Sequence, residues 1–128
     1  MTVAFWCVLI AIFLPYLCTC VAKFSSGKFG LRHNHDPRAF LETLEGFAKR
    51  AHNAQLNSFE VTPAFAAAVI VAHLAGNAEL VTINVLAVLF ITSRLLYIIC
   101  YLADWAILRS LVWFVGMALI ASFFFVSI

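Results

Sequence analysis

The chain has 128 residues, of which 65% are hydrophobic and 11% are charged, and its mean hydropathy is +1.03. These values exclude an ordinary soluble domain and indicate an integral membrane protein with one domain over residues 1–128. The net charge of +2 is small and its cations follow membrane topology, so we expect no nucleic-acid partner.

The first expected helix covers about residues 3–22, which is long enough to cross a bilayer. No cation precedes it, and it is longer than the apolar core of a typical signal peptide, so we interpret it as a transmembrane helix. The four cysteines form no CxxC pair and join no His at metal-ligand spacing, so we expect reduced thiols and no metal. They are Cys7, Cys18, Cys20 and Cys100.

The second expected helix covers residues 37–74. Asp36-Pro37 is a strong helix start, because Asp is a preferred N-cap and Pro at the first position loses no needed hydrogen bond. Apolar residues then recur at spacings of three and four from Phe40 to Ala51. The helix should begin in water, run into lipid and end at Gly76.

Two further helices are expected over about residues 80–103 and 107–128. Cations crowd the first loop and the start of the second helix, whereas the second loop carries only Glu79. By the positive-inside rule the first and third loops are cytoplasmic and both termini lie on the outer side. The predicted fold is an all-α, integral membrane four-helix bundle. The cations concerned are Lys23, Lys28, Arg32, Arg38, Lys49 and Arg50.

Two polar stripes cross the apolar helices. Four residues of the second helix lie at offsets 0, 3, 7 and 10 and share an arc of about 80°, and four residues of the third helix repeat the spacing. Both stripes lie at the same depth, so a direct pair between Glu60 and Arg94 is expected. Ionisable groups at membrane depth usually mark a site. The stripes are Arg50, Asn53, Asn57 and Glu60, and Arg94, Tyr97, Tyr101 and Asp104.

The stripes also have a plainer interpretation. Polar residues can join helices inside a structural or channel-like bundle, and Tyr and Trp can form an interfacial belt. The matched spacing and depth of the stripes, with Arg109 at their mouth, favour a ligand site. One bundle of four helices has little room for a cleft, so the site is expected between protomers.

The residues around these stripes resemble the MAPEG family, the membrane-associated proteins in eicosanoid and glutathione metabolism. Residues 54–65, AQLNSFEVTPAF, look like the helix-two signature in which Asn and Glu three apart precede Pro and Phe. The second match is Arg94-x-x-Tyr97-x-x-x-Tyr101, followed by Leu108-Arg109-Ser110. The resemblance covers nearly the whole chain.

The resemblance implies a homotrimer that holds glutathione between neighbouring protomers. Carried onto this chain, it implies that Arg109 stabilises the thiolate, and we assign Arg109 and Tyr101 as catalytic. The family usually has Arg where this chain has Asn53, and Arg50, one turn away, is the candidate substitute; Lys23 can supply a further cation. The expected glutathione-binding residues are Arg50, Asn53, Asn57, Glu60, Arg94, Tyr97 and Tyr101.

The expected function is a glutathione S-transferase or peroxidase acting on apolar electrophiles or lipids that reach the site through the membrane. We expect a bacterial inner-membrane protein whose site faces the cytoplasm. The alternative is a non-catalytic member of the same fold that binds glutathione or a lipid. The residues leave open the second substrate and the choice between conjugation, peroxide reduction and isomerisation.

Overall fold

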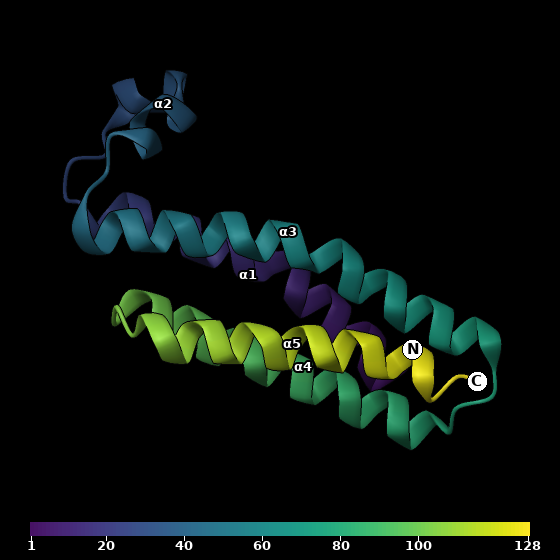
Figure 1. The fold of residues 1–128 in the computed structure, drawn as a ribbon. Helices are drawn as coiled ribbons and strands as arrows, with labels where there is room; N and C mark the ends of the chain where they lie inside the picture. Colours follow the sequence, from purple (N-terminus) through teal and green to yellow (C-terminus); the bar gives the residue numbers. More distant parts are fainter.

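Four long helices lie side by side in the computed structural model, which describes all 128 residues (Figure 1). They are α1 (Val3–Ser25), α3 (Gly46–Ala75), α4 (Leu80–Leu102) and α5 (Ala106–Phe125). Each helix is long and apolar enough to cross a membrane. The prediction of an all-α bundle of four apolar helices is therefore confirmed, and the protein is an integral membrane protein.

The prediction of one unbroken helix over residues 37–74 was wrong near its start. The short helix α2 (Pro37–Glu42) follows a 3-10 turn, η1 (Leu31–His35), and ends before α3 begins. Between them Glu45 is extended, with φ −135° and ψ 163°, and Gly46 has φ +59°, a left-handed value that favours glycine. The helix start itself is as expected, because the Asp36 side chain accepts a hydrogen bond from the Ala39 amide.

The regularly spaced apolar residues of this segment are buried in a folded-back cap and not along a longer helix. Phe40, Leu41 and Leu44 turn back and pack on Ala22 of α1 and Ala48 of α3, forming a small core at that end of the bundle. In Figure 1 the segment with α2 lies beside the first turns of α3 and away from α4 and α5. A helical spacing and a folded-back cap both bury these positions, so periodicity alone does not separate them.

Both termini lie at the end of the bundle that also carries the α3–α4 turn (Figure 1). Thr2 Oγ1 is 3.0 Å from His73 Nε2, which ties the start of α1 to the end of α3. Asn77 Nδ2 donates to the carbonyls of Ser127 and Ile128 at 3.1 and 3.2 Å. The opposite end carries α2 and the α4–α5 turn. The termini thus share one side, and the assignment of that side to the outside of the membrane stays a prediction.

The main core lies toward the end of the bundle that holds the termini. Phe65 of α3 and Phe90 of α4 stack with ring centroids 4.1 Å apart, and Phe123 of α5 meets Phe65 edge to face at 6.0 Å. In α5 only Gly116 and Phe123 are buried. Most of α5 is therefore free to contact lipid or another copy of the chain.

Candidate functional site

Arg94 forms a buried polar centre between α3 and α4. The residue is only 3% exposed. Its Nη2 donates to Asn57 Oδ1 at 2.8 Å and to Ser58 Oγ at 3.4 Å, and its Cζ lies 4.2 Å from the centroid of the Tyr97 ring. Hydrogen bonds and the ring face together offset the cost of burying the guanidinium.

The expected direct pair between Glu60 and Arg94 is not formed, because Asn57 lies between the two. Asn57 accepts from Arg94 through Oδ1 and donates to Glu60 Oε2 through Nδ2 at 3.4 Å. An amide has one acceptor oxygen and one NH2 group, so the bond from Arg94 fixes which side of Asn57 faces outward. Glu60 itself is exposed. Arg94 thus orients the Asn57 amide, and Glu60 remains available to a ligand or to another chain.

Two tyrosines and a second arginine continue the row along α4 and α5. Tyr97 is 5% exposed, and its ring meets that of Tyr101 edge to face at 5.7 Å. Arg109, near the start of α5, places its Cζ 4.3 Å from the centroid of the Tyr101 ring. A row therefore forms in which one guanidinium lies over each of two tyrosine rings, in the order Arg94, Tyr97, Tyr101 and Arg109. The structure brings together four of the predicted residues here.

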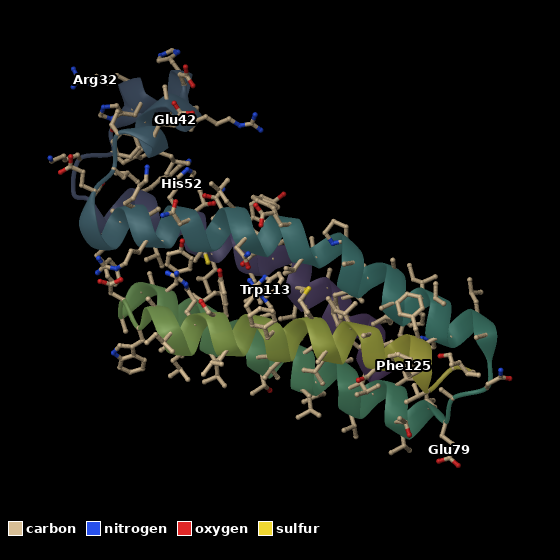
Figure 2. The ribbon with its side chains drawn as sticks, in the orientation of Figure 1. Arg32, Glu42, His52, Glu79, Trp113 and Phe125 are labelled. Atoms are coloured by element: carbon tan, nitrogen blue, oxygen red, sulfur yellow. The ribbon has the colours of Figure 1, made fainter.

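A pocket of about 250 Å³ opens beside this row. Trp113 lies on the side of α5 that faces α3 (Figure 2), and its ring meets that of Phe114 edge to face at 5.2 Å. From the sequence alone, Trp113 has the plainer interpretation of a residue in an interfacial belt of Tyr and Trp side chains. The available signal was its position four residues after Arg109, which places both on one helix face. The pocket is lined by Asn57, Tyr97, Arg109, Ser110, Trp113 and Phe114.

Arg50 and Asn53 do not join this pocket. The Nε of Arg50 donates to the Leu102 carbonyl at the end of α4, at 3.2 Å. Asn53 lines a different groove, of about 450 Å³, together with Arg38 and His52. Figure 2 shows His52 on the edge of α3 that faces α2, opposite to Trp113. The α3 stripe therefore divides between two sides of the helix.

A larger groove of about 720 Å³ lies between α1, α2 and α3. It holds the cations Lys23 and Arg38, the amide of Gln55 and the apolar side chain of Phe59. Gln55 precedes Asn57 by two residues, about 200° around α3 and 3 Å along it. The chain therefore has two polar faces at one depth, on opposite sides of α3.

No group of three His, Cys, Asp or Glu side chains lies close enough together to hold a metal ion. The four cysteines are free thiols, and Cys7, Cys18 and Cys100 are buried. The candidate site is therefore built from arginine, tyrosine, asparagine and glutamate side chains.

Comparison with known protein families identifies the family of this chain. A sequence model of the MAPEG family matches residues 3–128. No curated protein and no solved structure matches the chain. The family match covers the four membrane helices and every residue of the row and of the pocket, so this chain belongs to the MAPEG family.

Proposed function

We propose that this protein is a membrane glutathione S-transferase or peroxidase that activates the glutathione thiolate toward apolar electrophiles. The observation that carries the proposal is Arg109, which lies over the Tyr101 ring and lines the pocket with Asn57 and Tyr97. The MAPEG match supports the choice of glutathione, because the family acts in glutathione and eicosanoid metabolism.

The chemistry requires a cation beside the thiol. A cysteine thiol has a pKa of about 8.5, so only a few per cent is ionised at neutral pH. The guanidinium of Arg109 stays charged when partly desolvated and stabilises the thiolate. Tyr101 can donate its hydroxyl proton in a hydrogen bond to the sulfur. These two residues are the proposed catalytic pair.

The activated sulfur then serves either reaction. In a conjugation it bonds to an electrophilic carbon, and the leaving group departs with the electron pair of the broken bond. In peroxide reduction it takes one peroxide oxygen, and the released alkoxide takes up a proton. The resulting sulfenic acid condenses with a second glutathione to give the disulfide and water. Both routes begin with the same thiolate at Arg109.

Glutathione also carries two carboxylates and one ammonium group. The exposed carboxylate of Glu60 suits the ammonium, and the outward amide of Asn57 suits a carboxylate or a peptide group. Tyr97 lines the pocket, whereas the buried Arg94 contributes by orienting Asn57. We assign Asn57, Glu60, Tyr97, Tyr101 and Arg109 as the contacts from one protomer.

A homotrimer completes the site. One protomer leaves Glu60 open to the outside, so the second wall must come from elsewhere. The groove with Lys23 and Gln55 lies at the same depth on the opposite side of α3, and its cations, Lys23 and Arg38, suit a glutathione carboxylate. Contact between two different faces of one chain is heterologous and can close into a ring. By the positive-inside rule, the end with α2 faces the cytoplasm of a bacterial inner membrane.

The electrophile enters from the bilayer. Phe114 is 64% exposed on α5 and lines the same pocket as Arg109 and Trp113. An apolar molecule dissolved in lipid can therefore slide between helices to the sulfur without crossing water. The aromatic side chains give it apolar and ring contacts.

The test is a glutathione titration of the purified protein, followed by its ultraviolet difference absorbance and a panel of electrophiles and hydroperoxides. We expect saturable binding, a thiolate signal at neutral pH and turnover with at least one apolar substrate. Binding without turnover selects the alternative, a non-catalytic glutathione- or lipid-binding protein. Absence of binding selects a structural bundle and refutes the proposal.

A further inference from the structure

Arg50 contacts the end of α4 and not the pocket. It precedes Asn57 by seven residues, which is about two turns of α3 and 10 Å along the axis. Its side chain is half-buried, and its Nε donates to the Leu102 carbonyl at 3.2 Å. This bond joins residues 52 positions apart in the chain. Arg50 therefore ties α3 to the C-terminus of α4.

Among the last four carbonyls of α4, only that of Leu102 has no backbone amide as a partner. A helix C-terminus has unpaired carbonyls and a partial negative charge, so a cation there satisfies both. The three carbonyls before Leu102 accept amides from the turn itself. The amide of Ala103 donates to the Ile99 carbonyl at 2.9 Å, that of Trp105 to the Cys100 carbonyl at 2.9 Å, and that of Asp104 to the Tyr101 carbonyl at 3.2 Å.

The turn that Arg50 holds is short and strained. Only three residues, 103–105, join α4 to α5. Asp104 adopts φ +61° and is the only non-glycine residue of the chain with positive φ. A side chain with a Cβ disfavours this left-handed conformation, which glycine adopts freely. The amides of Asp104 and Trp105 close the turn back on α4, and Arg50 adds a contact to it from α3.

The same turn sets the distance between the two proposed catalytic residues. Tyr101 lies just before it and Arg109 just after it, with the guanidinium 4.3 Å from the ring centroid. We propose that Arg50 is a positioning residue, which fastens the α4–α5 turn to α3 and thereby holds Arg109 over Tyr101. The effect of Arg50 on catalysis rests on the proposed function, whereas the effect of Arg50 on the turn does not require glutathione.

The first test is hydrogen exchange of the full-length protein in detergent without glutathione. In Arg50→Ala, the backbone amides of the turn and the first turn of α5 should exchange about tenfold faster. Lys49→Ala is the matched control, because Lys49 is the neighbouring cation and lines the groove on the other side of α3. It should leave this exchange unchanged. Equal exchange at the turn in wild type and Arg50→Ala would overturn the proposal.

The second test separates positioning from direct binding. Arg50→Ala should keep the glutathione Kd within about threefold, while turnover and the thiolate fraction of bound glutathione fall about tenfold. Adding Asp104→Gly, which relieves the left-handed strain, should recover about fivefold of the turnover. A Kd raised more than tenfold with an unchanged thiolate fraction would make Arg50 a glutathione ligand and overturn the proposal. If the wild type binds no glutathione, the proposed function fails, and the exchange comparison still decides the role of Arg50.

Discussion

Arg109→Ala should abolish the thiolate at neutral pH without abolishing glutathione binding. A sulfur about 5 Å from the guanidinium gains about 3 kcal/mol at an effective dielectric constant of 20. That energy corresponds to a thiol pKa lowered by about two units, from about 8.5 to about 6.5. The sign follows from the charge, since the cation favours the ionised form and its removal raises the pKa of the thiol. The thiolate fraction at pH 7 should then fall about 25-fold.

The assay is the ultraviolet absorbance of the bound thiolate, measured with turnover from pH 6 to pH 9. The wild type should keep both signals down to about pH 6.5, whereas Arg109→Ala should recover them only as the pH passes about 8.5. Arg109→Lys is the control that keeps the charge and should retain part of the signal. A variant with full thiolate absorbance and normal turnover at pH 7 would refute the assignment and direct attention to Tyr101.

Three further substitutions separate binding, orientation and substrate access. Glu60→Gln should weaken glutathione binding about tenfold and leave the Tm unchanged, because Glu60 is exposed and bonds only to Asn57 at 3.4 Å. A greatly lowered Tm with unchanged glutathione affinity would give Glu60 a structural role instead. Arg94→Ala should lower the Tm and weaken glutathione binding together, since a buried hydrogen bond from a charged donor contributes about 1.5–3 kcal/mol. Glutathione titration and thermal unfolding measure the two effects, and a change in only one of them would contradict the orienting role of Arg94. Trp113→Ala should lower turnover of apolar electrophiles several-fold while the glutathione Kd stays unchanged. Initial rates that depend on electrophile concentration as they do in the wild type would contradict this role of Trp113.

Three of the four spans could be predicted from the sequence because each is set by one local property, an apolar run of the length a bilayer requires. The fourth, in α3, could be predicted because apolar periodicity extends its shorter apolar run upstream. The break before Gly46 could not, because Phe40 and Leu44 are buried equally well in a longer helix and in the folded-back cap. Gly46 was a visible signal, but a glycine is also tolerated inside a helix at a cost of about 1 kcal/mol. Local patterns therefore located the elements better than their ends.

The arrangement of the candidate site residues was predicted in part for a related reason. Helical spacing correctly placed Asn57 and Glu60 on one face and aligned Arg94 with them in depth. It did not determine the rotation of α4 about its own axis, which is fixed by packing and brings Arg94 to Asn57 instead of Glu60. An arc of about 80° is also wide enough for residues at its two limits to face different neighbouring helices. Asn53 and Asn57 consequently face different grooves.

Native mass spectrometry with glutathione, from a mild detergent, tests the central claim that copies of the chain share the ligand. The groove with Lys23 and the pocket with Arg109 lie on opposite sides of α3 in one chain, so we expect one glutathione to contact the pocket of one copy and the groove of its neighbour. The predicted result is a homotrimer that carries up to three glutathione molecules, while any dissociated protomer carries none. A monomer that binds glutathione as tightly as the assembly would contradict the account.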